Sequence, residues 1–231
     1  MTRGKNALLW IAALGSALPL AVAAAPKTVA WSNTVTLGAN GSHMLGNPEA
    51  GTRLVEYNSY TCPHCARYNL QSEGVLRLAY IPSGKISVEV RQFPLNPIDV
   101  AAAMLAACGP KEKFFLNHTA LLRSQEKWAA PISYATGAQQ ARWKHPDLGT
   151  RNRAIASDLH LYDVMETRGY DRQTLERCLT DKTEAARIEA QRAAAEADGV
   201  VGTPSFSING KLLLDTNDWA SLRPQLDESL R

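Results

Sequence analysis

The sequence predicts an α/β fold that is interrupted by a large all-helical insertion. Two early stretches, "TRLVEYNS" and "KISVEVRQF", are typical of strands. A long central stretch then favours helices, and strand patterns return only in "PSFSI" and "KLLL" near the end. We therefore expect a signal peptide at 1–25, an N-terminal extension at 26–50, an α/β domain at 51–97 and 199–231, and a helical insertion at 98–198.

The first strand is expected to begin at Thr52 and to end just before the motif "CPHC" at 62–65. Pro63 suits the first turn of a helix, where a missing N–H costs nothing, and leucines recur among the polar residues that follow. A second strand begins at Lys85 and alternates apolar with polar residues. Strand, helix and strand together predict a βαβ unit with a cysteine at the helix N-terminus.

The insertion is expected to consist of helices without a strand between them. Its helical stretches are "PIDVAAAMLAACG", "KEKFFLNHTALLRSQ", "DRQTLERCL" and "KTEAARIEAQRAAAEADG". Residues 128–150 show no clean period, so we expect a loop there. After the insertion, Asn209 and Gly210 predict a hairpin between the last two strands, and a final helix is expected from about Asp218.

The first residues have the pattern of a secretory signal peptide. Arg3 and Lys5 precede an apolar stretch interrupted by Gly15 and Pro19, and the small residues "AVAAA" follow. A single membrane anchor is the alternative, but the broken apolar run barely reaches the span of a bilayer. We therefore expect a periplasmic protein. Removing the two cations lowers the net charge from +3 to +1, which argues against nucleic acid or an anionic membrane as the main partner.

Several kinds of site could be built from the four cysteines, which are Cys62, Cys65, Cys108 and Cys178. A zinc site would need all four together, but the last two lie alone on separate predicted helices. A c-type haem would need a histidine after the second cysteine of the motif, where Ala66 stands. We expect no metal and no cofactor apart from a redox-active disulfide. A purely structural Cys62–Cys65 disulfide is the remaining alternative, although so short a loop constrains little chain entropy.

The position of Cys62 predicts its chemistry. A thiolate there would face the unpaired N–H groups and the positive end of the helix that begins at Pro63. His64 can add a hydrogen bond or a positive charge, or it is simply a solvated loop residue. A lowered pKa of Cys62 would stabilise the reduced pair and make its disulfide oxidising.

The other two cysteines are expected to form a structural disulfide within the insertion. Cys108 and Cys178 each sit near an apolar stretch, "MLAAC" and "LERCL", in a chain that we expect to mature under oxidising conditions. The alternative is two buried, unpaired cysteines that act as small apolar residues.

"EYNSYTCPHC", the helical insertion and "GVVGTPSFSING" resemble the DsbA-like thiol-disulfide oxidoreductases over about residues 45–230. In that family a thioredoxin fold is interrupted by a helical lobe. The resemblance implies that Cys62 is the exposed nucleophile and Cys65 its buried partner. It also implies that Pro204 is a cis-proline beside them and that Thr203 presents backbone groups to a bound peptide, which would pair like an added strand.

By the same resemblance, Glu56 is a buried acid near the second cysteine that relays a proton. An ordinary edge-facing carboxylate is the alternative. The chain also departs from the family pattern. Thr203 resembles the isomerase branch, whereas the oxidases usually have Val there, yet the residues before the first strand leave no room for an isomerase dimerisation domain. No lysine matches the basic partner of the buried acid, and Arg91 or Gln92 lies nearby instead.

These observations favour a monomeric periplasmic oxidase that transfers its Cys62–Cys65 disulfide to folding exported proteins. The resemblance implies a membrane-bound, DsbB-like quinone reductase as the partner that reoxidises it. A reductase or isomerase on the same scaffold is one alternative. A peptide-binding, chaperone-like protein with an inert disulfide is the other.

Overall fold

The computed structural model describes residue 1 and residues 30–231. The predicted signal peptide therefore lies, apart from Met1, outside the described residues.

A six-stranded mixed sheet forms the α/β part of the fold. Its strand order is β1-β2-β4-β3-β5-β6, and every described pair is antiparallel except β3 with β4, which is parallel. The strands are β1 (Val35–Leu37), β2 (His43–Gly46), β3 (Thr52–Asn58), β4 (Ile86–Gln92), β5 (Ser205–Ile208) and β6 (Lys211–Leu212).

The predicted βαβ unit is confirmed. Helix α1 (Pro63–Val75) follows β3, continues through a π-helical turn at Leu76–Tyr80 and a 3₁₀ turn at Ile81–Ser83, and returns the chain to β4. The predicted hairpin is also confirmed, because β5 and β6 pair around Asn209 and Gly210. Both of these residues have positive φ, as a tight hairpin turn requires.

The expectation that the first strand begins at Thr52 is wrong. β1 and β2 precede it within the expected N-terminal extension, where β2 pairs with β4 and β1 pairs with β2. These strands have only three and four residues. A run that short shows no alternation long enough to distinguish a strand from a loop.

Helices cover both faces of the sheet, and the alternation along β3 decides which side chain meets which helix. Leu54 belongs to the large core that includes α1 and α10 (Trp219–Ser229), whereas Val55 and Tyr57 pack with the end of α9 (Lys182–Ala197). Glu56 therefore points to the same face as Leu54. The predicted final helix is confirmed as α10, which Asp218 caps by accepting a hydrogen bond from the Ser221 amide at 2.8 Å.

The residues from 98 to 198 are all described and contain no strand, as predicted. The expected loop at 128–150 is wrong, because short helices fill most of it. Thr136 and Asp147 cap two of them, so their ends are set by local hydrogen bonds and not by an apolar period. Before α9 the helices are α2 (Pro97–Ala106), α3 (Phe114–Arg123), α4 (Gln125–Ala129), α5 (Gly137–Arg142), α6 (Leu148–Asp158), α7 (Leu161–Glu166) and α8 (Arg172–Leu179), with a 3₁₀ turn at Ala130–Tyr134.

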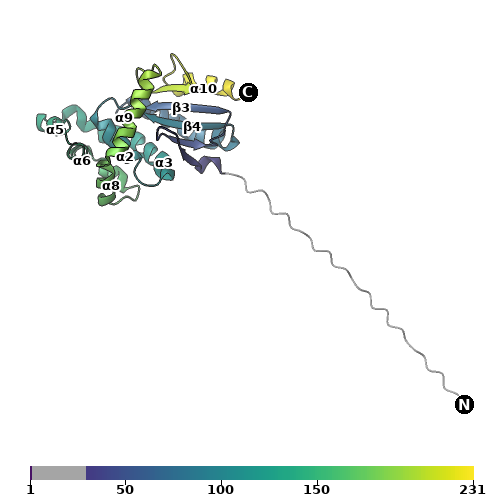
Figure 1. The fold of residues 1–231 in the computed structure, drawn as a ribbon, viewed down its shortest axis with the longest axis horizontal. Coiled ribbons are helices and arrows are strands. Elements are labelled where there is room, and N and C mark those ends of the chain that lie inside the picture. The colour runs from purple at the N-terminus through teal and green to yellow at the C-terminus, as the bar shows by residue number, and fades with distance from the viewer. Residues whose placement is uncertain (2–29) are drawn as a thin grey trace.

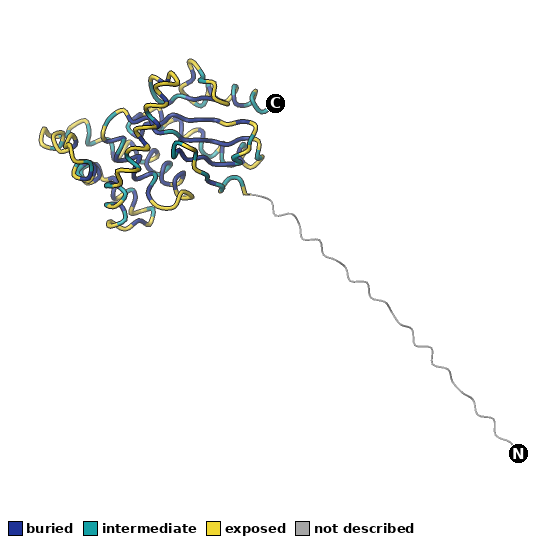
Figure 2. Tube along the Cα trace, viewed as in Figure 1, coloured by how far each residue is buried: buried dark blue, intermediate teal, exposed yellow. Residues whose placement is uncertain are grey.

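One continuous core joins the sheet to the helical segment. Leu54 of β3, Met104 of α2 and Ile155 of α6 belong to the same cluster of buried side chains. In Figure 1, α5, α6 and α8 lie on the side of the molecule away from α10. Figure 2 shows buried segments both in the sheet and in the interior of these helices.

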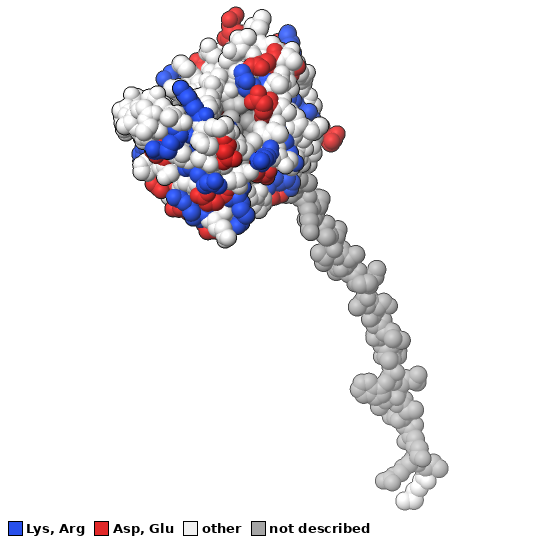
Figure 3. Space-filling model, turned by 60° about the vertical axis from the view of Figure 1, so that its left-hand side comes forward, with Lys and Arg blue, Asp and Glu red and all other residues white. Residues whose placement is uncertain are grey.

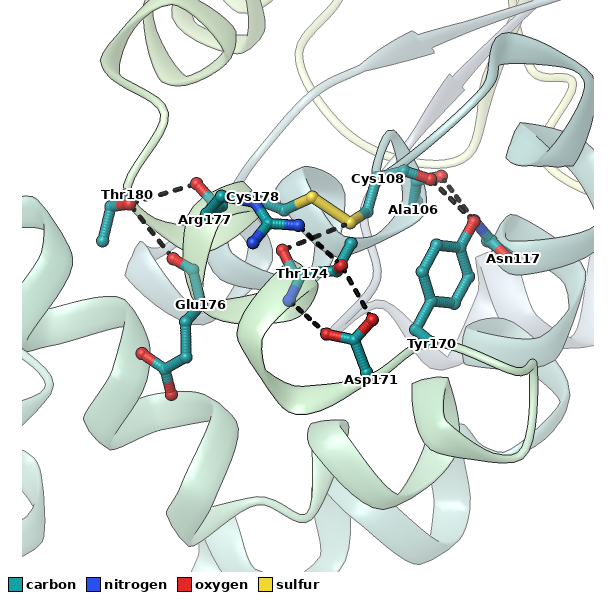
Figure 4. Close-up of a disulfide and its surroundings, with 10 residues drawn as sticks. All are labelled: Ala106, Cys108, Asn117, Tyr170, Asp171, Thr174, Glu176, Arg177, Cys178 and Thr180. Atoms are coloured by element: carbon teal, nitrogen blue, oxygen red, sulfur yellow. Dashed lines mark hydrogen bonds between the residues drawn. A yellow bond between two sulfur atoms is a disulfide. The ribbon is translucent and has the colours of Figure 1, made fainter.

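A disulfide joins Cys108, just after α2, to Cys178 on α8, with the two Cα atoms 5.6 Å apart. Figure 4 shows the polar groups around it. Tyr170 donates a hydrogen bond to the Cys108 carbonyl at 2.7 Å, and Asn117 donates one to the Tyr170 hydroxyl at 2.8 Å. The disulfide thus fastens the first helix after the sheet to a helix near the end of the insertion.

Charges of both signs are interspersed over the face shown in Figure 3. Within the described part of the chain, no helix combines the length and apolar character needed to cross a membrane.

Candidate active site

The two motif cysteines lie at the N-terminus of α1. Strand β3 ends at Asn58, a short turn of Ser59–Thr61 follows, and Cys62 is the N-cap of a helix whose first residue is Pro63. Cys65 lies on the first turn of the helix, facing inward. Both residues are thiols in the structure.

The expectation that Cys62 is an exposed nucleophile needs correction. Its exposed fraction is 7%, compared with 1% for Cys65. The main chain of Thr203 lies against it, and the Cys62 Sγ donates a hydrogen bond to the Thr203 carbonyl at 3.2 Å. Pro63 and His64 beside it are exposed.

The surroundings of Cys62 favour its thiolate. A hydrogen bond from the Cys65 thiol is the largest contribution that lowers the pKa of Cys62, which falls from 9.0 to about 5 although burial opposes the shift. The Thr203 side chain and the main-chain groups of Cys65 and His64 lower it further. His64 thus contributes through its amide, one of the free N–H groups of the first helical turn.

Cys65 has the opposite character. Burial raises its pKa well above 9.0, and the neighbouring Cys62 adds to the rise. The main chain of Ser59 and the side chain of Thr203 act against this. At neutral pH the pair therefore holds one thiolate, on Cys62, and one proton, on Cys65.

We expect the Cys62 thiolate to titrate with a midpoint near pH 5. The ultraviolet absorbance of the thiolate, followed against pH in the reduced protein, measures this midpoint. Cys65→Ala should raise the midpoint, because it removes the largest stabilising hydrogen bond, and Cys62→Ala should remove the step altogether. A wild-type midpoint near 9 would contradict the expectation.

Thr203 and Pro204 lie beside the cysteines, directly before β5. The peptide bond between them is cis. The Thr203 carbonyl accepts the hydrogen bond from the Cys62 thiol, and the Thr203 side chain lowers the pKa values of both cysteines. The structure thus brings together Cys62, Cys65, Thr203 and Pro204 from segments that are distant in the sequence.

Glu56 is buried beneath α1 and does not lie at an edge. Its carboxylate accepts a hydrogen bond from the Tyr68 hydroxyl at 2.5 Å. Burial raises the pKa of Glu56 from 4.5 to about 7, and the Tyr68 hydrogen bond opposes the rise. Burial also raises the pKa of Tyr68, and the charges of Glu56 and Cys65 add to it, which places Tyr68 near both groups.

No basic side chain fills the role of a partner for Glu56 among the described ion pairs. Arg91 instead binds Glu89, with 2.7 Å between Nε and Oε1, and approaches Asp198 at 3.9 Å. The register of β3 and β4 explains this, because Glu56 lies opposite Val90, and Arg91 points to the other face. The hydrogen-bond partner of Glu56 is instead the Tyr68 hydroxyl. Sequence reasoning missed Tyr68, because nothing in the sequence around a tyrosine shows which group its hydroxyl will bind.

The raised pKa of Glu56 predicts a pH-dependent stability. Because the folded pKa, about 7, exceeds 4.5, the protonated carboxyl stabilises the fold below pH 4.5, and this contribution is lost as pH rises through 7. The free energy of unfolding of Glu56→Gln should therefore be about 3 kcal/mol higher than that of wild type at pH 8. At pH 4 the two values should be nearly equal.

Urea denaturation at the two pH values measures the difference. The exposed Glu49→Gln serves as the control, because it removes one carboxylate without touching the buried site. An equal effect of Glu56→Gln at both pH values would contradict the prediction.

The helical insertion also reaches the site. Gln125 of α4 is buried and donates hydrogen bonds to the carbonyls of Tyr60, at 2.6 Å, and Cys62, at 2.9 Å. Asp99 of α2 accepts hydrogen bonds from the turn before Cys62. Sequence reasoning missed both residues, because each acts on its neighbours across the fold and neither belongs to a motif.

The described residues contain no group of three or more His, Cys, Asp or Glu side chains placed to hold a metal ion. The cysteines form two separate pairs, one a disulfide and one a pair of thiols. The chemistry that this arrangement supports is thiol–disulfide exchange at Cys62.

Fold and site together define a thioredoxin-like protein with a paired-cysteine centre and a helical insertion. The family model described as Thioredoxin matches residues 39–228. The chain belongs to the thioredoxin family.

Solved structures agree with this assignment. The chain is 48% identical to a protein-disulfide isomerase from Novosphingobium aromaticivorans, with a TM-score of 0.79, covering 83% of this chain and 98% of that one. It also has the fold of α-DsbA1 from Wolbachia pipientis, with a TM-score of 0.67 at 21% identity, covering 84% of this chain and 93% of that one. The fold is therefore DsbA-like.

Among curated proteins, a Rickettsia typhi protein provisionally named protein-disulfide oxidoreductase is 33% identical over 187 residues, which is 80% of this chain. The chain spans 61% of the length of that relative, and 54% of a second relative from Rickettsia prowazekii.

Proposed function

We propose that the protein is an exported thiol-disulfide oxidoreductase that donates the Cys62–Cys65 disulfide to folding proteins. The observation that carries this proposal is the environment of Cys62, a helix N-cap whose thiolate is stabilised by Cys65, by Thr203 and by main-chain amides. Stabilising the thiolate stabilises the reduced pair, which makes the disulfide form a stronger oxidant.

The reaction proceeds in two exchanges. A substrate thiolate attacks the Cys62 Sγ of the disulfide, the Cys62–Cys65 bond breaks, and Cys65 leaves with the electron pair and takes up a proton. A second substrate thiolate then attacks the substrate sulfur of the mixed disulfide, and Cys62 leaves as the stabilised thiolate. The substrate has lost two electrons and gained a disulfide, while the enzyme holds the reduced pair.

We propose that Glu56, hydrogen-bonded to Tyr68, exchanges a proton with Cys65. Glu56 has a pKa of about 7 and shares a short hydrogen bond with Tyr68, which lies near Cys65. A group of that pKa both accepts and returns a proton near neutral pH. In the proposed cycle it supplies the proton when Cys65 leaves and accepts it when the disulfide is restored.

Each cycle leaves the pair reduced, so an electron acceptor must restore it. We propose a membrane-bound, DsbB-like quinone reductase, acting on a monomer in the periplasm. The basis is the signal-like start of the chain and the resemblance of the motif region to DsbA-like oxidases.

An isomerase is the second candidate, and two observations favour it. Thr203, not Val, precedes the cis-proline, and the Novosphingobium aromaticivorans protein with 48% identity is described as a protein-disulfide isomerase. An isomerase or a reductase would need a different partner, one that keeps the Cys62–Cys65 pair reduced.

The reduction potential of the Cys62–Cys65 pair, measured by equilibration with glutathione, tests the proposal. A value of about −120 mV supports the oxidase, about −180 mV an isomerase, and about −270 mV a reductase. Failure of glutathione to reduce the pair at all would support a peptide-binding protein with an inert disulfide. A refolding assay with a scrambled test protein then separates isomerase from oxidase activity.

A further inference from the structure

Asp99 lies in the first turn of α2 and is only 1% exposed. Both oxygens of its carboxylate accept hydrogen bonds. Most of these come from the turn that leads into the cysteine pair. The Thr61 amide donates to Oδ1 at 2.7 Å, the Thr61 hydroxyl to Oδ2 at 3.0 Å, and the Ser59 hydroxyl to both oxygens at 3.0 Å. The Leu95 amide completes the set at 2.8 Å from Oδ2.

These donors are uncharged, and none of the ion pairs among the described residues includes Asp99. Every neighbour donates and the carboxylate accepts, which suits its ionised form. Burial nevertheless raises the pKa of Asp99 above 3.8. A buried anion without a cationic partner is costly for the fold, and the first turn of α2 and the hydrogen bonds offset part of that cost.

The turn that Asp99 binds adjoins both motif cysteines. Thr61 immediately precedes Cys62, and the main chain of Ser59 hydrogen-bonds Cys65. A second bond supports the same turn, because the Asn96 side chain donates to the Thr61 hydroxyl at 2.9 Å while its oxygen caps α2. The position of α2 is therefore transmitted directly to the cysteine pair.

The charge of Asp99 also reaches this turn. Burial raises the pKa of Tyr60, which lies between Ser59 and Thr61, and the negative charge of Asp99 adds to that rise. Like charges repel, so a carboxylate at Asp99 would act against a thiolate at Cys62, one residue beyond the turn. Asp99 thus has two effects, one on geometry and one on charge.

We propose that Asp99 is a positioning residue of the cysteine centre, which fixes the turn Ser59–Thr61 against the helical insertion and whose buried charge restrains the Cys62 thiolate. The charge then limits how strongly oxidising the disulfide becomes. The inference rests on the proposed redox function of the pair.

The two effects separate in two variants. Asp99→Asn keeps an acceptor for the Thr61 amide, loses the acceptor of the Leu95 amide and removes the charge. If the charge dominates, the Cys62 thiolate midpoint should fall by ~0.5 pH unit, with a roughly threefold shift of the glutathione equilibrium toward the reduced pair. Thr61→Val keeps the charge and removes the two hydrogen bonds of the Thr61 hydroxyl, the one donated to Asp99 and the one accepted from Asn96. It should slow disulfide transfer several-fold without lowering the midpoint.

Asp147→Asn is the matched control, because it removes one exposed carboxylate from the same insertion. Asparagine caps a helix as well as aspartate does, so the start of α6 should be unchanged. Its midpoint and transfer rate should equal those of wild type. Circular dichroism checks that each variant is folded, and Thr61→Val decides the geometric part even where Asp99→Asn does not fold.

A midpoint that is unchanged or raised in folded Asp99→Asn would overturn the charge effect, and a wild-type transfer rate in Thr61→Val would overturn the clamp. A merely structural loosening of the helix start would raise the midpoint, so the sign of the shift distinguishes the two roles. A wild-type protein that shows no low-pH thiolate and no disulfide transfer would instead contradict the proposed function, independently of Asp99.

Discussion

Replacing Cys62 with serine is expected to abolish disulfide transfer to a reduced test protein, with a loss of roughly 10³-fold or more. A serine hydroxyl forms no disulfide, and Cys65, only 1% exposed with a pKa raised well above 9.0, cannot replace the lost nucleophile. The measurement is the rate at which the oxidised enzyme generates disulfides in the test protein, followed by loss of free thiols.

Cys65→Ser is the informative companion, because it retains the Cys62 thiolate but cannot release a bound partner. It should also lose disulfide transfer, yet it should accumulate a mixed disulfide with an oxidised substrate, visible on a non-reducing gel. Cys62→Ser should trap nothing. Persistent transfer in Cys62→Ser would show that the reactive sulfur lies elsewhere.

Replacing both Cys108 and Cys178 with alanine is expected to lower the free energy of unfolding by about 4 kcal/mol. The disulfide closes a loop with a sequence separation of 70, and the loss reflects the greater conformational freedom of the unfolded chain. For a protein of this size the melting temperature should fall by about 10 °C. Thermal denaturation followed by circular dichroism measures both quantities.

The same variant should still transfer disulfides at low temperature, because the pair lies on α8 and at the end of α2, apart from the cysteines of α1. Mass spectrometry of the unreduced wild type should show peptides containing Cys108 and Cys178 linked to each other and to neither motif cysteine. A folded double variant without transfer activity would place this pair in the catalytic relay and contradict a structural role.

Much of the fold could be predicted because its central elements carry local signals. The strand before "CPHC", Pro63 at the helix start and the Asn209-Gly210 turn each depend on a residue's own backbone preference, and each is found where the pattern placed it. β1 and β2 were missed because they are strands only by virtue of their pairing across the sheet, β2 with β4 and β1 with β2. The short helices after Trp128 were missed because side-chain caps define them.

In the candidate site, too, the residues with a local sequence signal were predicted and those that act through distant contacts were not. Cysteine spacing and position in the chain pointed to Cys62 and Cys65 as the candidate redox pair, and the family resemblance predicted Thr203, Pro204 and Glu56 as neighbours. The exposure of Cys62 was wrong because it depends on a carbonyl that arrives from a distant part of the chain. Tyr68, Asp99 and Gln125 support the site through contacts across the fold, and such contacts leave no periodic or motif signal in a single sequence.

Cys62 and Thr203 lie 141 positions apart in the sequence, so they are synthesised at different times. A chain that emerges from its N-terminus can form β3, α1 and β4 before Thr203 has been delivered. Until β5 pairs with β3, Cys62 lacks both the carbonyl that covers it and the Thr203 side chain that lowers its pKa. The part of the thiolate stabilisation that Thr203 supplies is therefore expected late in folding, after the residues that bear Cys108 and Cys178 have emerged.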